Sequence, residues 1–236
     1  MKVGIMQPYF FPYLGYFSLI KHTDRFILLD EVQFIRHGWI ERNRVLKQNT
    51  DWLYIKVPIL KEGRETIIKD VKINNSNNWK QAIISQLAVY KRIAPNYHSV
   101  IGLVNSIFEH DYYDMVSLNN ASLQMVCNYL NITADINVFS EMGLTIDQPN
   151  EPDDWALNIC KAIGGVNEYW NPPGGKSFFD ESKYRKENIE IRFQQLNLSP
   201  YNQRRVPFIP GLSIIDVMMF NSVAEINRLL DDYKFL

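Results

Sequence analysis

The sequence predicts an α/β fold with a mostly parallel sheet, because short apolar runs alternate with segments of helical period. Val3–Met6 and Phe26–Leu29 are two such runs, and the helical stripe within Tyr13–Ile20 lies between them. A strand, a helix and a second strand in succession imply parallel strands joined by a right-handed crossover. The same alternation resumes at Thr133. We therefore interpret residues 1–236 as one α/β domain.

The opening stretch, Gly4–Ile20, is predicted to form a strand, a stiff loop and a helix. Pro8 ends the strand at Gln7, because a residue before proline favours an extended conformation. Pro12 suits the first turn of the helix, and Gly15 leaves backbone uncovered near the helix start. Such a loop places amide donors and the positive helix end at the carboxyl edge of a sheet, where α/β proteins bind ligands.

Two interpretations of the aromatic residues in this stretch stay open. They could form a hydrophobic plug that holds the first helix on the sheet, or they could line a ligand site. Gln7 favours the ligand site, since a polar amide at the exit of a buried strand needs a partner. The aromatic residues are Tyr9, Phe10, Phe11, Tyr13, Tyr16 and Phe17.

Asp30 follows the second strand and is therefore expected at the same carboxyl edge as Gln7. Contact with a ligand and a role as a helix cap or turn former are equally good explanations of this aspartate. The next segment, Val32–Arg44, lacks a clear period and is predicted to be a functional loop. Trp39 could stack on a sugar face, and the arginines could hold a phosphate or carboxylate, with a solvated basic turn as the alternative. These arginines are Arg36, Arg42 and Arg44.

The middle of the chain predicts a hairpin followed by helices. Trp52–Pro58 and Thr66–Ile73 alternate apolar and polar residues, which predicts an antiparallel hairpin with its turn at Lys61–Arg64. Residues 77–130 then show helical period, which indicates an inserted all-helical segment. The predicted fold is thus a Rossmann-like, mostly parallel sheet with an appended hairpin and a helical insert.

The last third of the chain supplies further strands and one glycine-rich loop. Strands are expected at Thr133–Phe139, Val166–Trp170 and Glu190–Phe193, with a helix at Asp153–Ile163. Asn171–Ser177 joins a glycine pair to a lysine and could hold an anion, although a structural turn explains it nearly as well and its spacing is not that of a P-loop.

The closing helix has its own start signal. Ser213 can cap this helix, with Asp216 three residues later as a variant of the capping box. Capping explains both residues without any function.

Composition limits the classes of function. A net charge of -1 and a pI near 6.4 give no overall electrostatic reason to bind nucleic acid. Cys127 and Cys160 lie among apolar residues and are interpreted as buried core residues. We find no spacing that specifies a metal site, no apolar run of the ~18 residues that a membrane span needs, and no export signal. The protein is therefore expected to be cytoplasmic.

Several blocks spread over nearly the whole chain together resemble one family. They are Gln7-Pro8-Tyr9 with Pro12 and Gly15-Tyr16-Phe17, Asp30 with Val32-Gln33-Phe34, Trp39 with Arg42-Asn43, Trp52-Leu53, Lys176 with Phe179-Asp180, and Leu212-Ser213-Ile214-Ile215-Asp216. On these blocks the sequence resembles the WbqC-like family, whose members are encoded in bacterial O-antigen and surface-polysaccharide gene clusters. It departs from the expected pattern at Glu31 and Glu41, where an aspartate and an amide are expected.

The resemblance implies a role in polysaccharide assembly and transfer of an aminoacyl group, such as glycine, onto an amino sugar carried by a nucleotide. Asp30 is the expected general base, and Gln7 the expected donor to the oxyanion. Expected partners are a nucleotide-linked sugar and an acyl or aminoacyl carrier protein. The expected substrate-binding residues are Tyr9, Tyr13, Gly15, Tyr16, Gln33, Trp39, Arg42, Asn43, Arg44, Asn171, Gly174, Lys176, Asp180 and Ser213.

Two alternatives come from other classes of protein. Pro12–Ile20 is similar to the strand-loop-helix signature of nucleotidylyl transferases and pantothenate-synthetase-like ligases, with Tyr13 and Tyr16 where those enzymes carry histidines. That resemblance implies an ATP-using enzyme, although tyrosine carries no positive charge at neutral pH. The second alternative is a non-catalytic sugar-binding or assembly protein. No cofactor is indicated, and no metal is expected.

Overall fold

A computed structural model describes residues 1–48, 51–61, 63–204 and 207–236 of the chain. The turn expected at Lys61–Arg64 includes Glu62, which lies outside these residues. Within these ranges no helix is both long enough and apolar enough to cross a membrane.

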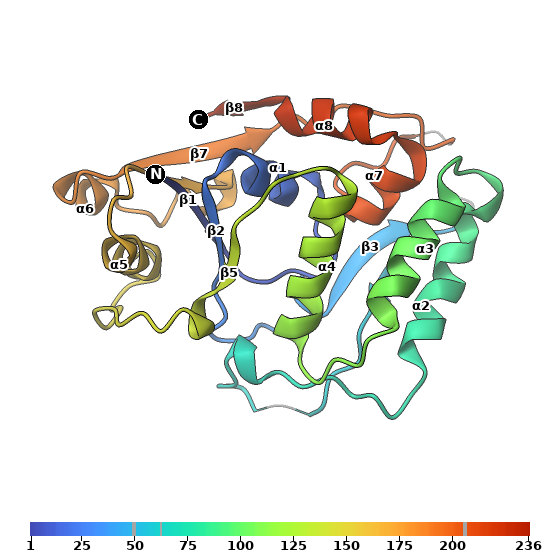
Figure 1. The fold of residues 1–236 in the computed structure, drawn as a ribbon, viewed down its shortest axis with the longest axis horizontal. Coiled ribbons are helices and arrows are strands. Elements are labelled where there is room, and N and C mark those ends of the chain that lie inside the picture. The colour runs from blue at the N-terminus through green and yellow to red at the C-terminus, as the bar shows by residue number, and fades with distance from the viewer. Residues whose placement is uncertain (49–50, 62, 205–206) are drawn as a thin grey trace.

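A six-stranded sheet with the order β5-β2-β1-β6-β7-β8 forms the centre of the described chain (Figure 1). Every neighbouring pair is parallel except β7 and β8. The predicted mostly parallel α/β fold is therefore confirmed. The strands are β1 (Lys2–Met6), β2 (Arg25–Leu28), β5 (Ile136–Val138), β6 (Glu168–Asn171), β7 (Glu190–Leu196) and β8 (Tyr233–Phe235).

Helices cover both faces of this sheet. Helix α1 packs on α8 and β7 on one face, whereas buried residues of α5 form a second apolar cluster with Val3, Ile5 and Ile27 of the sheet. The chain thus builds the sheet outward from β1, first to one side and then to the other. The helices are α1 (Leu14–His22), α2 (Trp79–Leu87), α3 (Tyr97–Phe108), α4 (Met115–Tyr129), α5 (Asp154–Ile163), α6 (Glu181–Lys186), α7 (Ile214–Phe220) and α8 (Val223–Asp231).

The direction of the crossovers reverses between β1 and β6, which lie next to each other in the sheet. In open α/β sheets, ligands bind outside the carboxyl ends of the strands at such a switch point. The loop after β1 begins at this place.

The appended hairpin exists, but one of its two strands was predicted wrongly. β4 (Trp52–Lys56) confirms the predicted strand, and it pairs with β3 (Arg42–Leu46), a segment expected to be loop. The expected partner, Thr66–Ile73, contains a 3₁₀ turn at Ile68–Asp70 instead. The sequence did not predict β3 as a strand, because its buried residues include the polar Asn43 and therefore do not form an apolar pattern.

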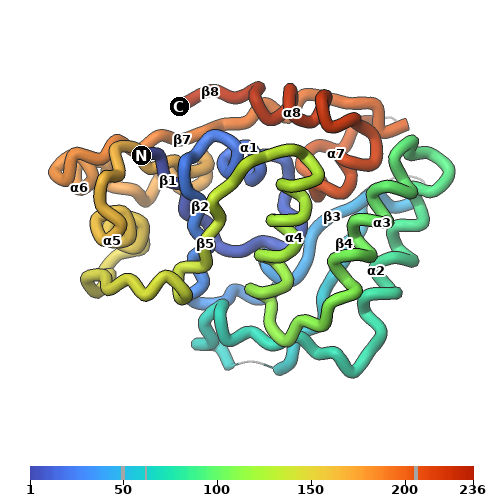
Figure 2. The backbone as a smooth tube through the Cα atoms, viewed as in Figure 1, coloured from blue at the N-terminus to red at the C-terminus, as the bar shows by residue number. Residues whose placement is uncertain are grey.

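The helical insert is confirmed as α2, α3 and α4, which fall within the predicted 77–130. Helix α2 packs on β4 and α3, while α4 packs on α3 and β5. Figure 2 shows α2 and α3 beside the hairpin, at the opposite end of the molecule from α5 and α6. The expected strands after residue 133 are confirmed as β5, β6 and β7, while α6 and β8 were not predicted.

Buried polar side chains fix the loop after β1. The amide of Asn119, on α4, donates to the carbonyls of Pro8 (2.8 Å) and Ile40 (3.0 Å). The amide of Asn43 donates to the carbonyls of Phe10 (3.0 Å) and Phe11 (2.9 Å). These bonds join the loop to the insert and to the hairpin, so a loop without regular structure has a fixed shape.

Ser213 completes this set of contacts from the carboxyl-terminal part of the chain. Its hydroxyl donates to the carbonyl of Phe11 (2.8 Å), and its oxygen accepts from the backbone N–H of Ile215 (3.3 Å). Ser213 is the N-cap of α7 as predicted, whereas the Asp216 carboxylate, expected to complete a capping box, accepts from the hydroxyls of Tyr90 (2.7 Å) and Tyr201.

Asn119→Ala should lower the free energy of unfolding by about 2–4 kcal/mol, because two buried carbonyls lose their donor. The neighbouring Asn120 is only partly buried, so Asn120→Ala is the matched control and should change the free energy by less than about 0.5 kcal/mol. Urea unfolding of both variants measures the difference. Equal effects would show that the Asn119 amide does not hold the loop.

Candidate functional site

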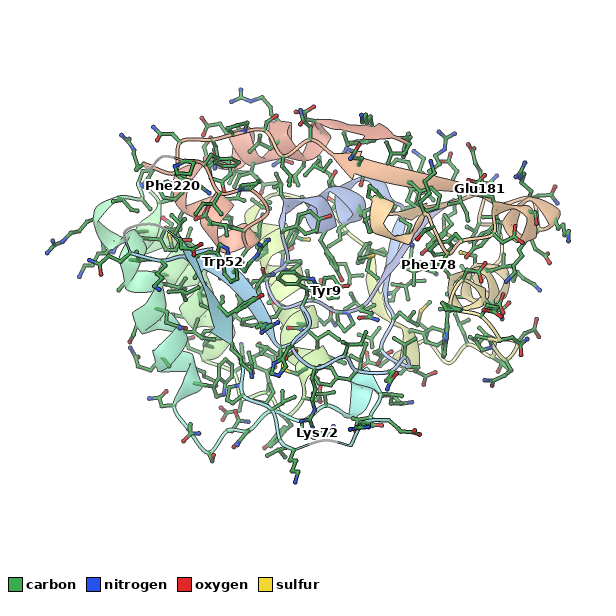
Figure 3. All side chains as sticks on the ribbon, turned by 180° about the vertical axis from the view of Figure 1, so that it is seen from behind. Tyr9, Trp52, Lys72, Phe178, Glu181 and Phe220 are labelled. Carbon is green, nitrogen blue, oxygen red and sulfur yellow. The ribbon has the colours of Figure 1, made fainter. Side chains whose placement is uncertain are left out.

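A pocket of about 270 Å³ opens at the carboxyl edge of the sheet. Its walls come from the loop after β1, the segment entering β3 and the chain after β7. Figure 3 shows Tyr9 near the middle of this face, with Trp52 to one side and Phe178 to the other. The lining residues are Tyr9, Pro12, Tyr13, Trp39, Asn43, Arg44, Leu198 and Gly211.

Tyr9, Tyr13, Trp39, Asn43 and Arg44 were all predicted as substrate-binding residues, and the structure brings them together in this pocket. Their segments are joined directly, since the backbone N–H of Phe10 donates to the carbonyl of Trp39 (2.8 Å). The loop after β1 is thus one wall of a pocket as well as an aromatic cover for the core.

Arg44 supplies positive charge to the pocket. Its guanidinium carbon lies 5.4 Å from the ring centroid of Trp39 and 5.2 Å from that of Trp52, within the range of cation–π attraction. Its Nη2 donates to the carbonyl of Gly211 (3.0 Å), whereas its buried Nε has no hydrogen-bond partner in the part of the chain that the structure describes. Arg44 is therefore held in place, and the terminal nitrogens of its guanidinium, rather than the buried Nε, can donate to an anion.

Tyr9 and Tyr13 contribute hydroxyl groups that remain protonated at neutral pH. Burial raises the pKa of both groups above 10, and the proximity of Tyr13 raises the pKa of Tyr9 further. A neutral phenol both donates and accepts hydrogen bonds. These hydroxyls can thus bind sugar hydroxyls, or donate to an oxygen that gains negative charge during a reaction.

Tyr16 and Gly15 support the pocket from behind and do not line it. The buried Tyr16 donates from its hydroxyl to the carbonyl of Gln7 (2.9 Å), and its ring lies 5.6 Å from that of Tyr9. A Cβ atom at Gly15 would lie 2.5 Å from the ring and hydroxyl of Tyr13. Glycine leaves room for the Tyr13 ring over the start of α1, and any larger residue would have to displace this ring.

The two predicted catalytic residues do not line the pocket. Asp30 is 1% exposed, and its carboxylate accepts from the backbone N–H (3.0 Å) and the hydroxyl (2.6 Å) of Ser140. Burial raises the pKa of Asp30, and the bonds from Ser140 oppose that shift. Asp30 thus holds the 3₁₀ turn Phe139–Glu141, which corresponds to the capping explanation. The half-buried side-chain amide of Gln7 makes no hydrogen bond with any described residue.

The predicted residues at the end of β6 and after it lie at the carboxyl edge beside β1, but outside the pocket. The amide of Asn171 donates to the Tyr169 hydroxyl (2.5 Å), and Lys176 lies 5.9 Å from the ring centroid of Phe193. Gly174 belongs to a 3₁₀ turn. Asp180 caps α6 by accepting from Ser182, which lowers the pKa of Asp180.

Two further predicted residues, Gln33 and Arg42, also make contacts away from the pocket. The Gln33 amide donates to the carbonyl of Arg64 (2.8 Å). Arg42 donates to the carbonyl of His37 and stacks on Tyr54, with its guanidinium carbon 4.0 Å from the ring centroid. Arg42 therefore braces the hairpin.

Leu198 and Gly211 line the pocket, although neither was predicted from the sequence as a site residue. The sequence offers a signal only for Gly211, which follows Pro210. In the structure Gly211 has a φ of 66°, a conformation that favours glycine. Leu198 carries no signal, because its role depends on where the chain after β7 returns.

The part of the chain that the structure describes contains no group of His, Cys, Asp and Glu side chains that could hold a metal ion. Both cysteines are buried, and burial raises the pKa of Cys127 and of Cys160 to about 12. Thiols with such a pKa are poor nucleophiles at neutral pH.

Comparison with known proteins gives a family for nearly the whole chain. The profile of the WbqC-like protein family matches residues 7–228. The uncharacterized protein Rv1507c of Mycobacterium tuberculosis is 28% identical over 228 residues, which is 95% of each of the two chains. No solved structure matches this chain.

Gly15→Ala should displace the Tyr13 ring and weaken binding of any ligand in the pocket, because the new methyl group overlaps this ring. Gly102 lies in α3 with open space around its Cβ position, so Gly102→Ala is the matched control. That control should stabilise the fold by about 0.5–1 kcal/mol. Tyrosine fluorescence and the chemical shifts of Tyr13 report the displacement. Unchanged Tyr13 signals in Gly15→Ala would contradict the packing described above.

Asp30→Asn should alter how stability depends on pH. Because the folded pKa of Asp30 is raised above 3.8, its contribution to stability is complete below that value and is lost as the pH rises through the raised pKa. The free energy of unfolding of the natural protein, minus that of Asp30→Asn, should therefore fall from acidic to neutral pH. Urea titrations over this range test the sign, and a difference that grew with pH would contradict it.

Proposed function

The chain belongs to the WbqC-like protein family, and on that premise we propose that it is a transferase of surface-polysaccharide assembly. It acylates the amino group of a sugar carried by a nucleotide, and the acyl group is of the aminoacyl, glycyl type. The observation that carries this proposal is the convergence of Tyr9, Tyr13, Trp39 and Arg44 on one pocket.

The chemistry of this pocket suits a sugar joined to a phosphate. Aromatic faces pack against the C–H faces of a sugar ring, while tyrosine hydroxyls exchange hydrogen bonds with sugar hydroxyls. Arg44, between Trp39 and Trp52, adds a fixed positive charge for the diphosphate. A volume of about 270 Å³ fits one monosaccharide unit, so the nucleotide extends out of the pocket.

In the proposed reaction the sugar nitrogen attacks the carbonyl carbon of an activated acyl donor, which is an acyl adenylate or a carrier thioester. The C–N bond forms, the electron pair of the C=O bond moves to oxygen, and the neutral hydroxyl of Tyr9 or Tyr13 donates to this oxyanion. The intermediate then collapses as the electron pair on oxygen re-forms the C=O bond. The donor's leaving group departs with its electron pair, and the nitrogen gives its proton to water.

The nitrogen must be unprotonated when it attacks. Asp30 is the base proposed from the sequence, but its oxygens already accept two hydrogen bonds from Ser140. These contacts favour attack by the fraction of substrate whose amine is already neutral. Full turnover in Asp30→Asn would remove Asp30 from the role of base.

Two other functions each have one observation in their favour. The switch point between β1 and β6 and the strand-loop-helix at β1 and α1 suit an ATP-using ligase or nucleotidylyl transferase. Against this, Tyr16 is buried and bonded to the backbone of Gln7. A non-catalytic sugar-binding protein would use the same aromatic pocket.

The test uses purified protein, a nucleoside-diphosphate amino sugar and glycine supplied as its adenylate or as a carrier thioester. We expect an amide product by mass spectrometry and a loss of about 10–100-fold in kcat/KM for Trp39→Ala. Tyr113 is exposed and does not line the pocket, so Tyr113→Ala should keep full activity.

Three results would contradict the proposal. If the natural protein forms no amide from either donor, the proposed acyl-transfer activity is contradicted. Binding of the sugar nucleotide without turnover would favour the sugar-binding alternative. Calorimetric binding of ATP with Mg²⁺, abolished by Gly15→Ala, would favour the ATP-using alternative.

A further inference from the structure

A second hollow is lined in part by the same segment that supplies Trp39 and Arg44 to the pocket. It is an open groove of about 750 Å³ between the residues that follow β4, the start of α2 and residues 36–41. The groove shares no lining residue with the pocket. Its lining residues include Glu41, Lys56, Asn77 and Asn78.

Glu41 is a buried acid with one unused oxygen. The residue is 1% exposed, and its Oε1 accepts from the backbone N–H of His37 (2.7 Å). Its Oε2 is buried and has no hydrogen-bond partner among the described residues. A buried carboxylate oxygen without a donor costs free energy, so this atom calls for a donor from outside the chain.

An exposed side chain lies beside the carboxylate of Glu41. The imidazole of His37 is 68% exposed, and its Nδ1 lies 4.0 Å from Oε1 of Glu41. His37 and Glu41 both line the groove, so a donor in the groove meets the Glu41 carboxylate from this side.

The opposite wall of the groove favours negative charge. Asn77, Asn78 and Trp79 line it at the start of α2, a helix of nine residues with no acidic side chain in its first turn. Asn78 caps this helix by accepting from the backbone N–H of Gln81 (3.3 Å). The positive end of the helix and the exposed ammonium of Lys56 both attract an anion.

We propose that this groove is a second binding site, for a small zwitterion that carries an ammonium and an anionic group. The ammonium donates to Oε2 of Glu41, and the anionic group lies between Lys56 and the start of α2. A ligand with only an anion would leave Glu41 unpaired, and one with only a cation would leave the helix end unused. An amino acid and an amino-sugar phosphate both have this chemistry.

This site is independent of the proposed transferase activity, because it is defined by binding alone. Calorimetry with glycine and with glucosamine 6-phosphate tests it directly and distinguishes the two sources of the zwitterion. N-acetylglucosamine 6-phosphate lacks the ammonium and glucosamine lacks the phosphate. Each should bind at least tenfold more weakly than glucosamine 6-phosphate if the phosphate form is the ligand.

Glu41→Gln should weaken binding of the preferred zwitterion at least tenfold, since it removes the charge while keeping the acceptor for His37. Glu109 is exposed and does not line the groove, so Glu109→Gln is the matched control. Lys56→Gln provides a second test on an exposed residue and should weaken binding of the same ligand. Trp39→Ala, which disables the pocket, should leave binding in the groove unchanged.

Nuclear magnetic resonance places the ligand, since amide shifts should concentrate at Asn77–Ala82 and at Glu41. The inference is overturned if neither zwitterion binds, if Glu41→Gln binds as well as Glu109→Gln, or if the shifts lie at Tyr9 and Trp39 instead. If the groove binds a zwitterion but the protein forms no amide, the proposed transferase activity is refuted, and the proposed binding site in the groove is not.

Discussion

The bonds from buried donors to the carbonyls after β1 are the constraint on which the candidate site depends. Asn119, Asn43 and Ser213 come from the insert, the hairpin and the last helical layer, and all three donate to this loop. The loop needs them because the buried Phe11 has a φ of 39°, a conformation that costs about 1–3 kcal/mol for a residue other than glycine. Three distant parts of the chain thus offset one local strain.

The same contacts assemble the pocket. Asn43 holds the loop, and its neighbour Arg44 carries the positive charge of the pocket, so two adjacent residues of β3 have separate tasks. The carbonyl of Arg44 in turn accepts from the N–H of Ser213 (2.9 Å). The three walls are therefore fixed by hydrogen bonds that exist without a ligand. Such a pocket is preorganised, and binding loses little conformational entropy in its backbone.

The sequence predicts the sheet well, because buried parallel strands are apolar runs that local signals bound. It predicts the site only where the lining residues are close in sequence, as Tyr9 with Tyr13 and Trp39 with Arg44 are. Leu198 lines the same pocket although it is distant from them in sequence, so no local sequence pattern predicts its place there. Asp30 was predicted at the correct edge of the sheet, but its role could not be predicted. Its position suits both contact with a ligand and capping of a turn, and only the hydrogen bond from Ser140 distinguishes the two.

The loop after β1 joins a strand to a helix, and its sequence resembles the strand-loop-helix signature of nucleotidylyl transferases, yet its side chains favour different chemistry. Of the two tyrosines that stand where nucleotidylyl transferases carry histidines, Tyr16 is buried and spends its hydroxyl on the Gln7 carbonyl. Tyr13 faces the pocket with a raised pKa and therefore donates as a neutral group. A neutral donor stabilises a single oxyanion but does little for the charge of a triphosphate. Under the proposed function, the side chains of this strand-loop-helix are thus better suited to an acyl-transfer intermediate than to phosphate displacement.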